Sequence, residues 1–173
     1  GSVTLGGGDL TVGSSDGSGI FSGVISQAGN VNKSGAGTQT LSGANTFDGN
    51  LTVSGGTLAL TGGGLVDVTG TTRLNNTGTI TLDGGSLTTG SLDNSAAGTL
   101  NFYDGTLSVE GGTFQPGTTD FTINGLAPTA NPTLRLTNGA TTNGLSGDLT
   151  VGDSANGLLS IESGGSVTNR SGY

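Results

Sequence analysis

The sequence predicts an all-β protein, a right-handed, single-stranded parallel β-helix (β-solenoid) with three sides and about eight coils. Two observations support this prediction. Apolar residues recur in short alternating triplets, and the triplets repeat with one short and one long spacing. No amphipathic run with the 3.6-residue spacing of a helix is present, so we expect almost no helix.

Most aliphatic side chains belong to triplets in which two apolar residues flank a third, usually small, residue. Successive side chains of a strand point to opposite faces, so each triplet places its apolar pair on one face. Gly-rich turns separate the triplets, and the 37 glycines suit turns that need positive φ. The triplets are Leu10-Thr11-Val12, Leu51-Thr52-Val53, Leu58-Ala59-Leu60, Ile80-Thr81-Leu82, Leu107-Ser108-Val109, Phe121-Thr122-Ile123 and Leu149-Thr150-Val151.

The short spacing between apolar residues is seven. Seven residues hold one short strand and one turn, which is too little for an antiparallel strand with its hairpin. Three such units make one coil that winds around a tube. The residues at this spacing are Leu51, Leu58 and Leu65 in one series, and Leu100, Leu107, Phe114 and Phe121 in another.

The long spacing is 20 or 21 residues, the length of three short units. We therefore expect each coil to lay three strands in parallel on the coil before it, so that apolar residues stack into columns. Right-handed winding is the general preference of parallel β connections. The long steps join Leu60, Ile80, Leu100 and Phe121, then Leu82, Phe102 and Ile123, then Leu87 and Leu107, and finally Phe114 and Leu134.

The charged residues exclude several classes of partner. The chain has 4 Lys and Arg against 12 Asp and Glu, a net charge of −8. Nucleic acids and anionic membranes both require clustered cations, so we expect neither as a partner. No run of 18 apolar residues is present, and we expect no direct membrane insertion by this segment. The cations Lys33, Arg73, Arg135 and Arg170 are all isolated from one another.

The chain contains no Cys and no His. This excludes disulfides, thiolate metal sites, thiol catalysis, Ser–His nucleophiles and proton transfer by His within the chain. A glycosidase with two carboxylates needs neither residue type. The acids here lack the basic and aromatic residues that such an enzyme places around them, Tyr103 beside Asp104 being the one suggestive pair. We predict that the chain is not an enzyme and binds no cofactor.

Three Asp-Gly pairs follow predicted strands: Asp48-Gly49, Asp83-Gly84 and Asp104-Gly105. In a turn, Asp accepts hydrogen bonds from nearby backbone N–H groups and Gly takes the left-handed conformation, which explains all three pairs. The alternative is a Ca²⁺ ion bound by Asp83 and Asp104, which are 21 residues apart and could lie on neighbouring coils. The sequence lacks the nonapeptide array of calcium-loaded β-rolls.

Residues 23–60 resemble the autotransporter-associated β-strand repeat, which is found in the passenger regions of bacterial autotransporters. The stretches K-x-G-x-G-T, from Lys33 to Thr38, and L-S-G-A-N-T, from Leu41 to Thr46, are the most specific. Gln39 and Phe47 depart from the usual pattern. The matching residues are Gly23, Val24, Ile25, Gly29, Val31, Lys33, Gly35, Gly37, Thr38, Leu41, Gly43, Asn45, Thr46, Gly49, Val53, Gly55, Gly56, Thr57 and Leu58.

Residues 147–173 resemble a second repeat of similar proteins, with the pattern V-G-x(4)-G-x-L-x-I-x-x-G-G-x-V between Val151 and Val167. We therefore divide one solenoid, residues 1–173, into 1–60, a divergent section 61–146, and 147–173. The resemblance implies a passenger β-helix that is exported across the outer membrane and is displayed at, or released from, a bacterial surface. We interpret the chain as a segment of such a longer protein.

Residues 125–133 contain Pro128 and Pro132, so we expect a loop that bulges from the tube and is a candidate contact site. The leading functional hypothesis is a structural passenger or stalk segment, supported by neighbouring coils of the same chain, that presents or acts as an adhesin. One alternative is a module that binds surface glycans or itself and forms fibres. Further alternatives are a polysaccharide-active enzyme and an ice-binding solenoid, although the outward positions mix Thr with Ser, Asp, Asn and Gly.

Overall fold

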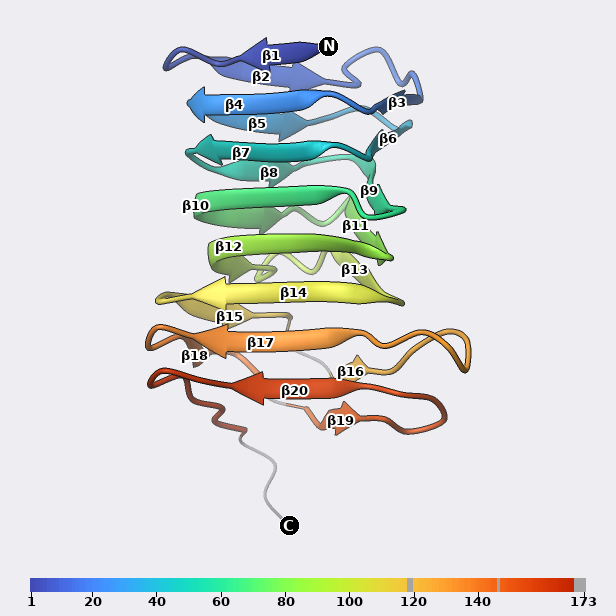
Figure 1. Ribbon diagram of the computed structural model, residues 1–173, viewed down its shortest axis with the longest axis vertical. Coiled ribbons are helices and arrows are strands. Elements are labelled where there is room, and N and C mark those ends of the chain that lie inside the picture. The colour runs from blue at the N-terminus through green and yellow to red at the C-terminus, as the bar shows by residue number, and fades with distance from the viewer. Residues whose placement is uncertain (118–119, 146, 170–173) are drawn as a thin grey trace.

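The computed structural model describes residues 1–117, 120–145 and 147–169. Throughout this part of the chain the regular elements are β-strands, which stack in parallel as a β-solenoid of about seven turns (Figure 1). The predicted all-β class and parallel β-helix are confirmed. One face carries eight strands, and eight levels enclose seven complete turns, close to the eight coils expected from the sequence.

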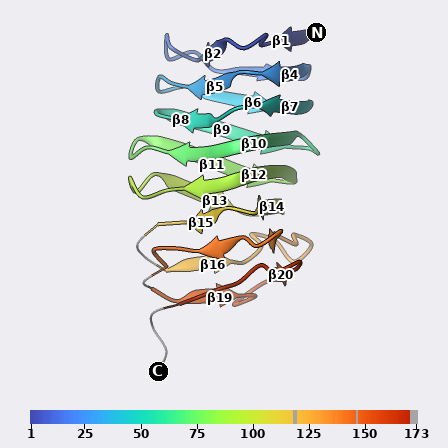
Figure 2. The same ribbon diagram turned by 90° about the vertical axis from the view of Figure 1, so that its left-hand side faces the viewer.

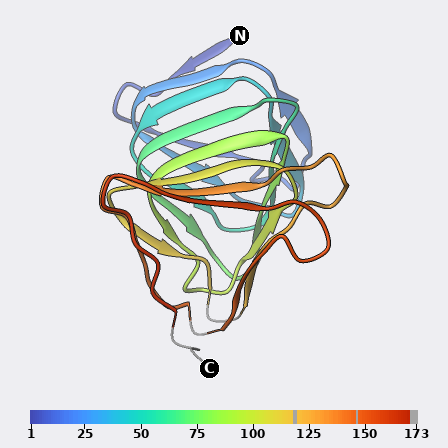
Figure 3. The same ribbon diagram turned by 60° about the horizontal axis from the view of Figure 1, so that its bottom comes forward.

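Each turn contributes one strand to each of three faces, and the view in Figure 3 shows the closed outline of the coils. The first face contains β1 (Ser2–Thr4), β4 (Val24–Ala28), β7 (Ala44–Asp48), β10 (Leu65–Leu74), β12 (Gly85–Asp93), β14 (Gly105–Glu110), β17 (Thr133–Thr137) and β20 (Leu158–Ile161). The second face contains β2 (Asp9–Val12), β5 (Asn30–Lys33), β8 (Leu51–Val53), the ends of β10 and β12, β15 (Thr113–Gln115) and β18 (Thr141–Thr142). The third face contains β3 (Gly19–Phe21), β6 (Thr38–Leu41), β9 (Gly56–Thr61), β11 (Gly78–Asp83), β13 (Thr99–Phe102), β16 (Phe121–Ile123) and β19 (Leu149–Val151).

The seven-residue step moves the chain from one face to the next. Leu51, Leu58 and Leu65 lie on β8, β9 and β10, which belong to the second, third and first faces. A strand of three to six residues followed by a Gly-rich turn fills this step. The hydrophobic pattern therefore predicted both the strands and the corners.

The core consists of inward side chains stacked in columns along the tube. On the first face Val66, Leu87, Leu107 and Leu134 pair in register, and none of them is exposed to solvent. Each such residue contacts its equivalents above and below, and burying one aliphatic side chain contributes about 1.5–3 kcal/mol. Figure 2 shows the same level-by-level stacking from the side.

Four of the predicted long steps are wrong: Leu60 to Ile80, Phe114 to Leu134, Leu100 to Phe121, and Phe102 to Ile123. Leu60 does not pair with Ile80: Leu58 pairs with Ile80 and Leu60 with Leu82. The corner between β9 and β10 is longer than the equivalent corner between β6 and β7, because it carries the additional turn residues Gly62 and Gly63, both with positive φ.

The predicted step from Phe114 to Leu134 is also wrong. Phe114 pairs with Thr142 on the second face, and Leu134 pairs with Leu107 on the first. The cause is the long connection of residues 124–132 between β16 and β17, which lengthens this coil beyond 21 residues.

The third face is interrupted once. Its first five strands end at β13, and β16 and β19 form a separate two-stranded sheet. The first face runs unbroken past this point through β12, β14 and β17. Leu100 and Phe121, which the long period joined, therefore lie on the same face without pairing.

Candidate functional site

The only lysine of the chain, Lys33, is completely buried at the corner that follows β5. Its ammonium donates hydrogen bonds to the carbonyl oxygens of Ser34 at 2.7 Å, Gly35 at 3.0 Å and Gly55 at 3.0 Å. An ammonium has three donors, and all three are used. Because Gly55 belongs to the next coil, this one cation ties together the corners of two successive coils.

Burial lowers the pKa of the Lys33 ammonium, and the carboxylate of Asp16 offsets part of that shift. Asp16 lies at the same corner one coil earlier, where its Oδ1 accepts a hydrogen bond of 2.7 Å from the N–H of Ala36. Three consecutive coils thus meet at this corner through two charged side chains. The arrangement can hold backbone in place, and all of the donors of Lys33 are already occupied.

Asn45, on β7, is another buried polar residue, and it is 0% exposed. Its Oδ1 accepts from the N–H of Ile25 at 3.1 Å, and its Nδ2 donates to the carbonyl oxygens of Gly43 at 3.0 Å and Leu65 at 3.2 Å. The side chain therefore bridges the coil before and the coil after its own. A buried amide with these partners stabilises the stack, whereas an unpaired one would destabilise it.

A ladder of side-chain amides runs along the corner between the first and second faces. The Oδ1 of Asn30 accepts from the N–H of Asn50 at 2.8 Å, and the Oδ1 of Asn50 accepts from the N–H of Thr71 at 2.9 Å. At the upper end, the Nδ2 of Asn30 donates to the Oδ1 of Asp9 at 2.7 Å. These side chains accept hydrogen bonds from backbone N–H groups of the next coil at this corner.

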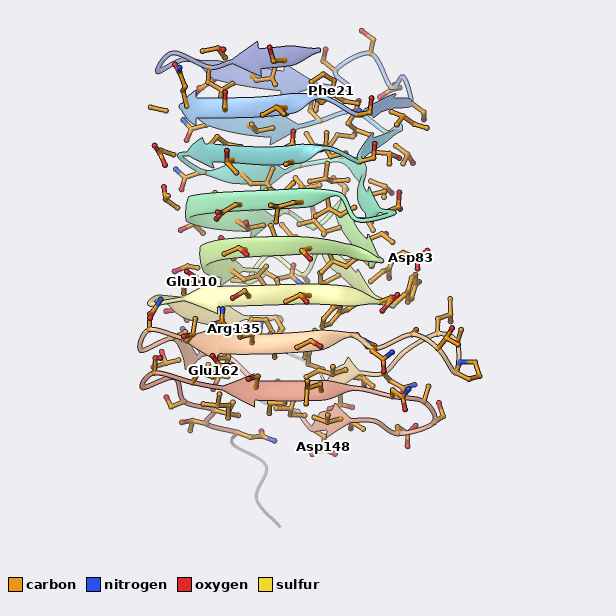
Figure 4. The ribbon with its side chains drawn as sticks, viewed as in Figure 1. Phe21, Asp83, Glu110, Arg135, Asp148 and Glu162 are labelled. Atoms are coloured by element: carbon orange, nitrogen blue, oxygen red, sulfur yellow. The ribbon has the colours of Figure 1, made fainter. Side chains whose placement is uncertain are left out.

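Ion pairs on the outer surface also join coils. Arg135 on β17 lies between Glu110 at 3.5 Å and Glu162 at 3.1 Å, and Figure 4 shows the three side chains one below another. The hydroxyl of Ser160 and the guanidinium of Arg135 lower the pKa of Glu162. On the second face Arg73 pairs with Asp93 at 3.0 Å. The pKa of Asp93 is lowered chiefly by hydrogen bonds from Ser95, with a smaller contribution from Arg73.

Of the sequence-derived calcium candidates, Asp83 is the last residue of β11, and Asp104 lies between β13 and β14 on the next coil. The carboxylate of Asp104 accepts hydrogen bonds from the N–H of Gly105 at 2.8 Å and of Asn131 at 2.9 Å. This is the bonding that the turn interpretation assigns to Asp. Within residues 1–117, 120–145 and 147–169, no three acidic side chains come close enough to form a metal site.

Two loops project from the solenoid side by side, and both are visible at the edge of the outline in Figure 3. Residues 124–132 connect β16 to β17, and residues 152–157 connect β19 to β20. The Oδ1 of Asn124 accepts from the N–H groups of Ser154 at 3.2 Å and Ala155 at 2.8 Å. Asn156 donates to the carbonyl of Pro128 at 3.2 Å. The predicted proline loop is therefore braced by the next coil.

A hollow of about 350 Å³ lies between these two loops. Its walls are formed by residues 125–128 of one loop and 154–156 of the other, and Leu126 is 74% exposed. Ser154 and Asn156 supply polar groups, and Ala127 and Pro128 supply apolar surface. We name this the loop hollow, and it is the candidate contact site of the chain.

These observations define a β-solenoid repeat protein. Residues 31–60 match the family model described as Passenger-associated-transport-repeat, and together with the solenoid this match fits the repeat region of an autotransporter passenger. That family is a structural passenger repeat rather than an enzyme family. No curated protein and no solved structure matched the chain.

The matched segment contains two of the buried polar residues that join coils, Lys33 and Asn45. The sequence analysis identified Lys33 only as an isolated cation and did not predict its burial. The signal that could have revealed it is the fixed K-x-G-x-G-T stretch, in which Gly residues surround the cation. The ion pairs around Arg135 were also missed, because their sequence separations exceed the 21-residue period.

Proposed function

We propose that this chain is a structural section of the passenger region of a bacterial autotransporter-like protein, a stalk that holds contact loops away from the cell envelope. The main support is that the family-matched segment, residues 31–60, lies within a stack of coils that continues on both sides. Buried bridges and in-register columns make such a stack rigid. The proposal assigns the chain no enzymatic activity and locates it outside the cell.

The first and last coils carry apolar side chains that pack on the core and are only partly buried. At the first coil Val3, Leu10 and Phe21 pack on the core but remain partly exposed, and Leu149, Leu159 and Val167 do so at the last. None of the described residues forms a helix long and apolar enough to cross a bilayer.

Surface labelling of intact cells tests this proposal. Antibodies raised against the purified chain should label intact cells of the source bacterium, and brief treatment of those cells with an added protease should remove the signal. Labelling that appears only after the cells are lysed would show that the protein is not displayed. A periplasmic marker protein that stays intact during the protease treatment serves as the control.

An adhesin role for this section is a second candidate, and the loop hollow is the observation that favours it. Neutral hydrogen-bonding groups next to apolar surface suit an uncharged sugar better than a charged ligand. The labelled chain should then bind a subset of glycans on an array, and Leu126→Ser should weaken that binding. Ile20→Ser, which changes an equally exposed apolar residue far from the hollow, is the matched control. Equal loss in both variants would exclude the hollow as the site.

A further inference from the structure

The interruption of the third face leaves β13 and β16, the third-face strands of two successive coils, without pairing to one another. In Figure 1, β13 lies between the levels of β12 and β14, and β16 lies between the levels of β17 and β20. The other two faces have a strand at each of these levels, joined by pairing from coil to coil. On the third face no described strand lies between the levels of β14 and β17. The chain returns to a regular ladder only with β16 and β19.

Both sides of this gap present backbone groups that no strand pairs. The N–H of Tyr103 donates to Leu82 on β11, so the alternation of a parallel ladder directs the N–H and C=O of Leu100 toward the gap. On the other side, the N–H of Phe121 donates to Asp148 and the N–H of Gly152 to Ile123. The N–H and C=O of Thr122 therefore point back toward β13. Two parallel edges face each other here.

A hollow of about 290 Å³ opens at the start of these two strands. Leu100, Pro116 and Phe121 give it apolar walls, and Asn94 closes it from the interior. Asn94 is only 4% exposed, and its Nδ2 donates to Gly98 at 2.9 Å and Pro116 at 2.7 Å. Its Oδ1 is the one buried side-chain oxygen or nitrogen in the described part of the chain that has no hydrogen-bond partner.

An unpartnered buried acceptor destabilises a protein by about 1–3 kcal/mol, so a ligand that donates to the Oδ1 of Asn94 gains free energy. The carboxylate of Asp120 lines the same hollow, and its Oδ1 accepts from the N–H of Asp148 at 2.8 Å. Its second oxygen adds negative charge in a chain that is already acidic. The hollow thus favours a ligand that carries N–H donors, an apolar side chain and a cationic group.

We propose that the gap between β13 and β16 binds an extended polypeptide segment of a partner protein, which adds as one parallel strand and completes the third face. A peptide in β conformation offers backbone donors and acceptors on both of its edges, as the unpaired groups of Leu100 and Thr122 require. The segment carries an apolar side chain directed at Leu100 and Phe121, and a Lys or Arg near Asp120. This site is distinct from the loop hollow and does not depend on the passenger assignment.

Engineered disulfides measure the width of the gap. Adjacent paired strands lie about 4.8 Å apart, whereas strands separated by a missing neighbour lie about twice that distance, beyond the roughly 7 Å limit for Cα atoms of a disulfide. Asn101→Cys with Thr122→Cys spans the gap, and Thr122→Cys with Thr150→Cys spans a paired ladder. The chain has no other Cys. We expect the second pair to oxidise and the first to remain as free thiols. Efficient disulfide formation by the first pair would show that β13 and β16 pair directly, which overturns the proposal.

A peptide probe measures the binding itself. The probe is a fluorescein-labelled Lys-Thr-Leu-Thr-Leu-Thr peptide, and its fluorescence anisotropy is followed while the intact chain is added. We expect saturable binding that weakens at least about tenfold when alternate backbone nitrogens of the peptide are methylated, because those donors are lost. Asp120→Asn should weaken binding about threefold, and Asp153→Asn, which removes an equal charge outside the hollow, should leave it unchanged. Absence of saturable binding, or equal binding of the methylated peptide, contradicts the proposal.

Discussion

The ammonium of Lys33 lies 3.0 Å from the carbonyl oxygen of Gly55, one coil further along the stack. Both residues belong to the family-matched segment, and the cation is fully enclosed. A lysine in such a position links two coils, because backbone carbonyl oxygens accept all three of its hydrogen bonds and the carboxylate of Asp16 stabilises its charge further. It also shows how a chain with few charges uses one of them in its interior.

Replacing Lys33 by Met should destabilise the solenoid. Met fills a similar volume but leaves the carbonyl groups of Ser34, Gly35 and Gly55 without this donor, and the expected loss is about 2–3 kcal/mol. Urea unfolding followed by circular dichroism measures it as a lower midpoint. Arg73→Met removes a cation that is more than half exposed, and should shift the free energy of unfolding by less than about 1 kcal/mol. Equal losses in the free energy of unfolding for the two variants would contradict the proposed role of Lys33 in linking the coils.

Close stacking of coils makes particular glycines irreplaceable. Gly105 and Gly63 have similar positive φ values, +93° and +85°, so Ala is strained at both. A Cβ at Gly105 would collide with the carbonyl oxygen of Gly85 on the neighbouring coil, whereas one at Gly63 meets no atom within 4 Å. We expect Gly105→Ala to destabilise the chain by about 1–3 kcal/mol more than Gly63→Ala, the usual range for overpacking. Similar melting temperatures of the two variants would show that the coils are not packed as described.

The fold was largely readable from the sequence because each coil repeats the same short units. The triplets identified the strands, and the seven-residue step placed Leu51, Leu58 and Leu65 on successive faces. The register between strands of successive coils was harder to predict. Gly62 and Gly63 look like any other turn glycines, yet they shift Leu60 onto Leu82, because corners can lengthen without disturbing the strands that they join.

The site was less predictable than the fold. Pro128 marked a loop, but the hollow beside it also needs Asn156, which lies a coil away in space and has no distinctive sequence signal. Asn94 has no distinctive signal in the sequence, and only the structure shows that its amide oxygen is buried without a partner. Both features depend on which residues of neighbouring coils come together at a corner, and a single sequence does not specify this.

Acid should weaken the stack through Asp93. The pKa of this carboxyl is lowered by hydrogen bonds from Ser95 and by Arg73, so the folded state holds its proton less tightly than the unfolded state. Its contribution to stability is present above the unfolded pKa of about 3.9, and is lost as the pH falls through the lower folded value. Ser95→Ala should raise the pKa of Asp93, measured by NMR titration of the carboxyl carbon, and should flatten the loss of stability on acidification. An unchanged pKa would contradict the assigned cause.

The ion pairs around Arg135 should contribute little to stability. Arg135, Glu110 and Glu162 are all at least a third exposed, and exposed pairs contribute about 0–1 kcal/mol. Arg135→Gln should therefore lower the urea midpoint slightly at low ionic strength, and the difference should vanish in concentrated salt. A large loss that persists in high salt would mean that the side chain packs on the surface in a way that its charge does not explain.

The calcium hypothesis for Asp83 and Asp104 can be tested without any partner. Asp83→Asn with Asp104→Asn keeps an acceptor oxygen at each turn and removes both charges. If the residues serve only as turn formers, the thermal unfolding midpoint of the wild-type chain will be the same with calcium and with chelator, and the variant will remain folded. A calcium-dependent rise in the wild type that the variant loses would instead establish a metal site.

Backbone NMR of the isotopically labelled chain tests the central claim most directly. The stacked solenoid predicts nuclear Overhauser contacts of the parallel type between Val66 and Leu87, and between Leu87 and Leu107. It predicts no hairpin contacts between neighbouring segments such as β8 and β9. Antiparallel contacts between consecutive strands, in place of those between successive coils, would contradict the solenoid and everything inferred from it.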